Sequence, residues 1–165
     1  MRREIPRSSL TREGQHLQRW EPAAAERQMT TPPPIDEPNA LAEQIRTLGL
    51  SKIRRHIFLC AEQTKPKCCP RELTSVSWAY LKKRVHDLGL GEGDQVVYRS
   101  KVDCLRVCSN GPIAVVWPDG IWYRHATPEV LERILREHII GGRPVRDYII
   151  AEPGHALDPA GQLSD

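Results

Sequence analysis

Residues 54–60 read Arg-Arg-His-Ile-Phe-Leu-Cys, and this run decides how the rest of the chain can be arranged. Its polar and apolar residues alternate and then give way to consecutive β-forming side chains, which predicts a strand that ends at Cys60. A polar, proline-containing loop follows over residues 61–71. Apolar residues then recur at helical spacing as far as Gly89, which stands where a helix C-cap is expected. These helical positions are Trp78, Leu81, Val85 and Leu88.

The second half of the chain predicts a hairpin and a second helix. Asp119-Gly120 is a two-residue hairpin turn, and a helix is expected from Thr127, a good N-cap, to about Gly141. Three segments carry strand patterns: 95–99, 112–117 and 121–124. The order is β-α-β followed by β-β-α. It predicts a compact two-layer α/β domain over residues 53–150.

The flanks of this domain have a different composition. Residues 1–40 hold six of the 14 prolines and predict a disordered extension, within which Met29 is a candidate for the true start. Residues 41–52 predict a lead-in helix with one apolar stripe, formed by Leu41, Ile45 and Leu48. Residues 151–165 show no periodicity and predict a flexible tail.

Composition limits the class of protein. A chain of 165 residues, 39% hydrophobic and 27% charged, fits one soluble globular domain with tails. No apolar run approaches the roughly 20 residues of a membrane helix. No secretory or transit signal is recognisable either, so we expect a cytoplasmic protein. A net charge of +3 gives little support for nucleic acid as a partner.

The cysteines carry the strongest chemical signal. An odd number of thiols without an export signal argues against a disulfide framework and favours metal or redox chemistry. Two predicted strands each end just before a cysteine-containing loop, and a right-handed crossover would bring both loops to one sheet edge. Four thiolates from such loops can enclose a binuclear iron-sulfur cluster, and Gly111 would allow close backbone approach. The five cysteines are Cys60, Cys68, Cys69, Cys104 and Cys108.

Three other interpretations of the cysteines have less support. Structural zinc normally uses paired Cys-x2-Cys knuckles, so the wider spacing here disfavours zinc without excluding it. A thiol-disulfide enzyme uses Cys-x-x-Cys at a helix N-terminus, and the adjacent Cys68-Cys69 pair is a poor substitute because it bridges only with strain. Burial as small apolar side chains conflicts with the polar loops that surround them.

Four segments resemble the thioredoxin-like 2Fe-2S ferredoxins, the Shethna-type group, over about residues 53–150. They are His56–Cys60, Lys67–Pro70, Cys104–Pro112 and Val115–Tyr123. The resemblance implies a thioredoxin-like fold, a common dimeric state and one 2Fe-2S cluster on four cysteines from two loops. The implied ligands are Cys60, Cys69, Cys104 and Cys108. Cys69 follows from an ungapped match of the next helix, and Cys68 stays an alternative. The first loop is shorter than in the best-known members.

The sequence predicts a carrier rather than an enzyme. No histidine is paired in sequence with a nucleophile or base, and His138 reads as a satisfied core residue. Trp117, Trp122 and Tyr123 are expected to pack in the core or at a dimer face. We expect one-electron transfer from a reductase to an acceptor protein, with no membrane or nucleic-acid partner. A cluster-transfer or storage module and a zinc-stabilised thioredoxin-like binding module remain alternatives.

Charges and backbone amides near the cysteines are expected to stabilise a reduced cluster. Positive side chains outnumber the nearby acids Glu62 and Asp103 and should raise the reduction potential. They are Lys65, Lys67, Arg71, Lys101 and Arg106. The backbone amides of residues 109–111 are predicted to donate hydrogen bonds to cluster sulfurs.

Overall fold

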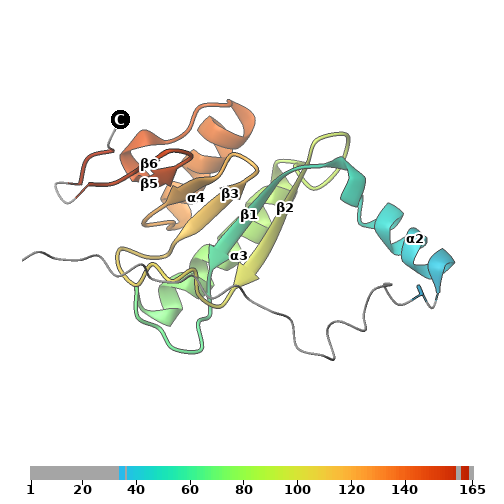
Figure 1. The fold of residues 1–165 in the computed structure, drawn as a ribbon, viewed down its shortest axis with the longest axis horizontal. Helices are drawn as coiled ribbons and strands as arrows, with labels where there is room; N and C mark the ends of the chain where they lie inside the picture. The colour runs from blue at the N-terminus through green and yellow to red at the C-terminus, as the bar shows by residue number, and fades with distance from the viewer. Residues whose placement is uncertain (1–33, 36, 159–160, 164–165) are drawn as a thin grey trace, which may run out of the picture. The chain divides into compact units, whose positions relative to one another are not determined.

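The computed structural model describes residues 34–35, 37–158 and 161–163 (Figure 1). The chain divides into two units, and the second, residues 39–165, contains the six-stranded sheet. Most of the predicted disordered extension, including Met29, lies outside the described residues.

A six-stranded mixed sheet has the order β2-β1-β3-β4-β5-β6 (Figure 1). Its strands are β1 Ile53–Cys60, β2 Val96–Val102, β3 Ala114–Trp117, β4 Ile121–Tyr123, β5 Ile149–Glu152 and β6 His155–Ala156. β1 pairs in parallel with β2 and antiparallel with β3. The crossover between β1 and β2 contains helix α3, Arg71–Asp87. The predicted parallel pair is therefore confirmed, and both cysteine loops begin at the same end of neighbouring strands.

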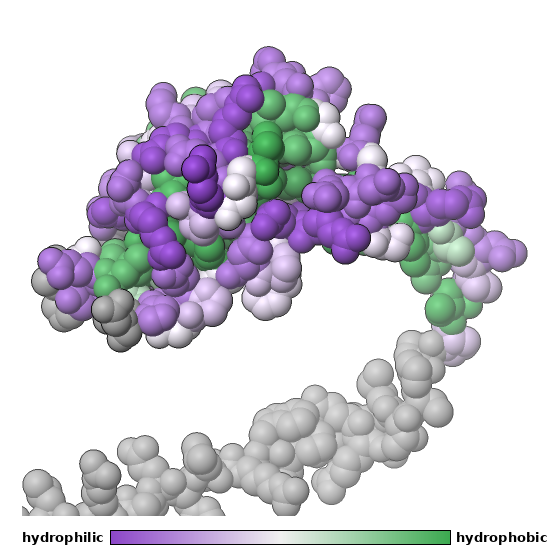
Figure 2. Space-filling view, turned by 90° about the horizontal axis from the view of Figure 1, so that it is seen from above, coloured by the Kyte–Doolittle hydropathy of each residue, from purple (hydrophilic) through white to green (hydrophobic). Residues whose placement is uncertain are grey.

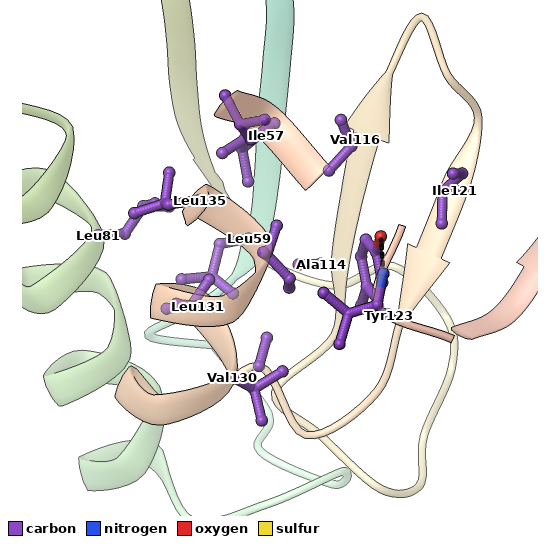
Figure 3. Packing of buried hydrophobic residues seen from close by; sticks show 14 of the residues in the cluster. Ile57, Leu59, Leu81, Ala114, Val116, Ile121, Tyr123, Val130, Leu131 and Leu135 are labelled. Carbon is purple, nitrogen blue, oxygen red and sulfur yellow. Dashed lines mark hydrogen bonds between the residues drawn. The ribbon is translucent and has the colours of Figure 1, made fainter. Parts of the chain in front are cut away.

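The helices α3 and α4, Pro128–Arg133, enclose one core together with a single face of the sheet. Alternate residues of β1, Ile57 and Leu59, belong to that core, whereas the intervening Phe58 does not. Figure 3 shows Leu81 of α3 and Leu131 of α4 among these side chains. This is the two-layer α/β arrangement that the sequence predicts.

Several boundaries differ from the sequence expectations. The lead-in helix α2 begins earlier, at Pro38–Thr47, and a 3-10 turn, Leu50–Lys52, links it to β1. The last helix continues beyond Arg133 as widened π-type turns over Ile134–Ile140. The predicted flexible tail contains the end of β5 and all of β6, because β5 pairs with β4 and β6 with β5.

A polar network ties the β3-β4 turn to the last helix. Asp119 Oδ2 lies 2.6 Å from Arg55 Nε and 2.9 Å from His138 Nε2. His138 Nδ1 lies 2.9 Å from the hydroxyl of Tyr123, which accepts a bond from the backbone N–H of Val145. Burial lowers the pKa of His138, and a neutral ring satisfies every contact by donating from Nε2 and accepting at Nδ1. The prediction that His138 is a satisfied core residue is confirmed.

On the face that Figure 2 shows, hydrophilic residues predominate, and hydrophobic areas lie between them. Trp117 is 60% exposed and does not pack in the core, whereas Trp122 is half-buried and Tyr123 is fully buried. The alternative location of Trp117 at a dimer face stays a prediction. Within the part of the chain that the structure describes, no helix has the length and apolar character to cross a bilayer.

Candidate metal centre

Cys60 is the buried thiol of the candidate centre. It ends β1, where its N–H donates to the carbonyl of Ile113 at 2.9 Å, and the next N–H donates to Val102 at 3.0 Å. These bonds hold Cys60 between the segments that lead into and out of the second cysteine loop. Its Sγ lies 3.5 Å from the carbonyl oxygen of Asp103, the residue before Cys104. The two loops therefore meet at this strand end.

Gln63 is a site residue that the sequence analysis missed. Its side chain is 2% exposed, and its amide nitrogen lies 3.1 Å from Cys60 Sγ and 3.5 Å from Cys68 Sγ. The hydroxyl of Thr74 lies 3.2 Å from the amide oxygen of Gln63 and 2.7 Å from the carbonyl oxygen of Arg71. A buried amide that presents N–H groups to sulfur stabilises thiolate charge. No periodicity or spacing signals such a residue, because only the folded loop turns it inward.

The adjacent thiols of Cys68 and Cys69 lie 3.8 Å apart and are half-buried. Gly111 of the second loop packs directly against both. A Cβ at Gly111 would stand 2.6 Å from Cys68 Sγ and 3.1 Å from Cys69 Sγ. The close approach expected at this glycine is therefore present.

Cys104 and Cys108 are the exposed thiols, and the peptide of Arg106 lies between them. The Arg106 N–H donates to Cys104 Sγ at 3.3 Å, and the Arg106 carbonyl lies 3.7 Å from Cys108 Sγ. The Gly111 N–H donates to the carbonyl of Cys68 at 3.4 Å. Hydrogen bonds from the amides of residues 109–111 to the sulfurs of a bound cluster stay a prediction.

An open cavity of about 580 Å³ lies where the two loops face each other. Cys104 and Cys108 line it together with three cationic side chains, Lys65, Lys67 and Arg106. Asp103 also lines it, but its carboxylate accepts the backbone N–H of Thr64 at 2.5 Å. That hydrogen bond lowers the pKa of Asp103. The cavity therefore combines two accessible sulfurs with an excess of positive charge.

Burial governs how easily the inner thiols ionise. It raises the pKa of Cys60, and the hydrogen bond from Gln63 opposes this effect. Burial, followed by the hydrogen bond with Cys68, raises the pKa of Cys69 to about 12. Thiolate charge at these positions needs a compensating cation, which bound iron would provide.

The donor set fits a binuclear cluster. Among the described residues, no three histidine, cysteine, aspartate or glutamate side chains converge on one point as a single metal ion would require. A 2Fe-2S cluster instead takes two thiolates on each iron. Cys68 and Cys69 lie against Gly111, whereas Cys104 and Cys108 line the cavity. Gln63 and Arg106 direct N–H groups at three of the sulfurs. Cys60 ends β1, and the other four cysteines lie in the two apposed loops.

This two-layer α/β fold brings two cysteine loops together at the end of strand β1. Such an arrangement is typical of a class of iron-sulfur proteins. Comparisons with known proteins identify the family. No protein-family profile matches the sequence. A 2Fe-2S ferredoxin of Aquifex aeolicus (strain VF5) is 30% identical over 103 residues, which span 59% of this chain and 90% of the relative. A 2Fe-2S ferredoxin of Clostridium pasteurianum is 29% identical over 100 residues, 56% of this chain and 92% of that relative.

Solved structures agree with the sequence matches. The thioredoxin-like [2Fe-2S] ferredoxin from Aquifex aeolicus superposes with a TM-score of 0.50 at 26% identity, covering 66% of this chain and 96% of that one. The chain belongs to the thioredoxin-like 2Fe-2S ferredoxin family. The predicted family and fold class are confirmed.

Proposed function

We propose that this protein is a one-electron carrier that holds one 2Fe-2S cluster on Cys60, Cys69, Cys104 and Cys108, with Cys68 as the alternative to Cys69. It would accept an electron from a reductase and pass it to an acceptor protein. The proposal extends family membership to ligation and to electron transfer, and it includes the homodimer that the resemblance implies.

The apposition of the two cysteine loops is the observation that carries this proposal. Cys60 Sγ lies 3.5 Å from the Asp103 carbonyl, and Gly111 would meet both thiols of the adjacent pair if it carried a Cβ. Loops far apart in the sequence are thus in contact through the positions that bear or adjoin sulfur. Such contact is what a cluster shared between the loops requires.

The second ligand is the one position with two candidates. The resemblance to the family favours Cys69, and its half-buried thiol lies close to Gly111. Cys68 is also close, because the amide of Gln63 lies within 3.5 Å of its sulfur as well as near Cys60. Separate serine substitutions distinguish the two.

When bound, the cluster supplies a one-electron couple whose reduced form carries one more negative charge. The residues of this chain favour that charge in two ways. Gln63 and the Arg106 backbone direct N–H groups at cysteine sulfur, and Lys65 and Lys67 add positive charge at the cavity. Both effects raise the reduction potential.

Visible absorption and low-temperature EPR of anaerobically purified protein test the proposed function. We expect a brown protein that bleaches with dithionite and then shows a spin-half signal. A colourless protein with stoichiometric zinc would contradict the proposal. A cluster that passes rapidly to an apo acceptor without reversible reduction would favour cluster transfer instead.

Serine variants identify the ligands. We expect Cys69→Ser to lose or shift the visible spectrum, whereas Cys68→Ser retains it, because serine oxygen is a poor substitute for thiolate on iron. Iron content and EPR line shape provide the measurement. The reverse pattern would assign the ligand to Cys68, and an unchanged spectrum in Cys104→Ser would contradict the proposed ligand set.

Gln63→Leu should lower the reduction potential while the cluster is retained. The substitution keeps a side chain of similar size but removes the N–H groups directed at Cys60 and Cys68, so the reduced form loses stabilisation. A redox titration followed by visible absorption measures the shift. Gln95→Leu, at an exposed position in the loop before β2, is the matched control. Equal reduction potentials in wild type and Gln63→Leu would show that the Gln63 amide does not stabilise the reduced cluster.

A further inference from the structure

We propose that the turn 104–108 docks on an acidic surface of a protein redox partner through a basic rim formed by Lys65, Lys67 and Arg106. The inference rests on the proposed function, since it concerns where the electron leaves the protein. It specifies the charge of the partner's docking surface, which family membership does not determine.

Exposure determines where a partner can approach the sulfurs. Cys104 and Cys108 are exposed, whereas Cys60 is 1% exposed and the adjacent pair is half-buried. The two exposed thiols line the same cavity of about 580 Å³ as the three cationic side chains. The shortest path from a partner to the thiols therefore passes the basic rim.

The three cations of the rim are available to a partner. None of them forms an ion pair with another residue in the described ranges, although several other basic side chains do. Two acids of the cysteine loops are engaged elsewhere: Glu62 pairs with Lys101, and the Asp103 carboxylate accepts a hydrogen bond from the Thr64 N–H. Positive charge without an internal partner is what attracts an acidic surface.

Arg106 gives the second and independent observation. Its backbone φ is 67°, in the left-handed region where glycine is the unstrained residue. Its peptide groups contact Cys104 and Cys108, and a glycine would supply the same groups. Within the described part of the chain its side chain has no hydrogen-bonding or ionic partner. The Arg106 side chain therefore lines the same cavity as the exposed thiols without serving an internal contact of the fold.

The same surface suits a protein better than nucleic acid. Nucleic-acid binding relies on many cations that neutralise successive phosphates, whereas this rim has three and the whole chain carries a net charge of +3. A compact group of cations beside an electron-transfer centre fits a local acidic patch on a folded partner.

Small oxidants of opposite charge test the rim without the natural partner. Dithionite-reduced holoprotein is mixed with hexacyanoferrate(III), an anion, or hexaammineruthenium(III), a cation. Each oxidant gains one electron as one reduced protein is oxidised. At low ionic strength we expect Lys65→Glu/Lys67→Glu to slow oxidation by the anion about tenfold and to accelerate oxidation by the cation. High salt should abolish both differences.

Lys52→Glu/Arg54→Glu is the matched control, because it makes the same charge change at the opposite end of β1. It should alter either rate less than about twofold. Arg106→Gly should slow oxidation by the anion severalfold while the visible spectrum is retained. Equal responses of the rim and control pairs would overturn the inference, because only net charge would then matter.

Binding probes distinguish the class of partner. Fluorescence anisotropy should show rim-dependent binding of poly-L-glutamate at low salt. Tighter rim-dependent binding of duplex DNA at the same salt would overturn the protein assignment.

The visible spectrum of wild type separates the two proposals. A colourless protein contradicts the proposed function, whereas a brown protein with no rim effect contradicts only this inference.

Discussion

Gly111→Ala is expected to abolish most cluster binding while the domain stays folded. The added Cβ would stand 2.6 Å from Cys68 Sγ and 3.1 Å from Cys69 Sγ, so the two loops must separate. Overpacking of this kind costs about 1–3 kcal/mol, and the separation moves the thiols that the cluster needs. Iron content and visible absorption measure the loss, and far-UV circular dichroism checks the fold.

Gly91→Ala is the matched control for Gly111→Ala. A Cβ at Gly91 meets no other atom within 4 Å, so this variant should bind iron like wild type. The double variant Gly111→Ala/Cys68→Ala relieves the closest contact. If Cys69 is the ligand, the double variant should recover part of the cluster. Full cluster occupancy in the single variant Gly111→Ala would show that cluster binding does not require the close contact of Gly111 with Cys68 and Cys69.

Asp119→Ala is expected to destabilise the fold by about 2–4 kcal/mol, because it leaves a guanidinium and an imidazole without their shared partner. Arg55 Nε and His138 Nε2 both contact Asp119 Oδ2, and His138 is 2% exposed. For a domain of this size the loss corresponds to a fall of roughly 10 °C in Tm. Thermal unfolding of the holoprotein, followed by circular dichroism, measures it.

Asp147→Ala removes a carboxylate that contacts Arg133 at 3.2 Å but is 71% exposed. An exposed pair contributes about 0–1 kcal/mol, so this control should change Tm little. The visible spectrum of Asp119→Ala should stay unchanged, since Asp119 lies in the turn at the far end of β3 from Ile113. Similar Tm values for the two variants would mean that the buried network contributes no more than a surface pair.

The strands and the cysteine loops could be predicted because they depend on local patterns. The run before Cys60 and the apolar segment before Trp117 read as strands, and the Asp119-Gly120 turn joins β3 and β4 as expected. The crossover rule then placed Cys60 and Cys104 at one end of two parallel strands, and β1 and β2 are parallel.

Residues that depend on tertiary contacts were not predictable in the same way. Gln63 gains its role only because the loop turns it inward, and Arg106 reads as an ordinary charged residue until its backbone conformation is known. β5 and β6 lack the alternation of a long strand, and they form by pairing with β4 and with each other. The sequence pattern also cannot decide whether Cys68 or Cys69 is the second ligand, because adjacent residues occupy nearly the same place.

The parallel pairing of β1 and β2 sets an order of assembly for the proposed cofactor. Cys60 ends β1 and Cys104 follows β2, and the chain between these strands forms the α3 crossover. The proposed ligands are therefore within reach of one another only in a chain in which β1 and β2 have paired. A delivery protein would have to load a polypeptide that has already acquired its tertiary structure, so cluster insertion would be a late event in maturation.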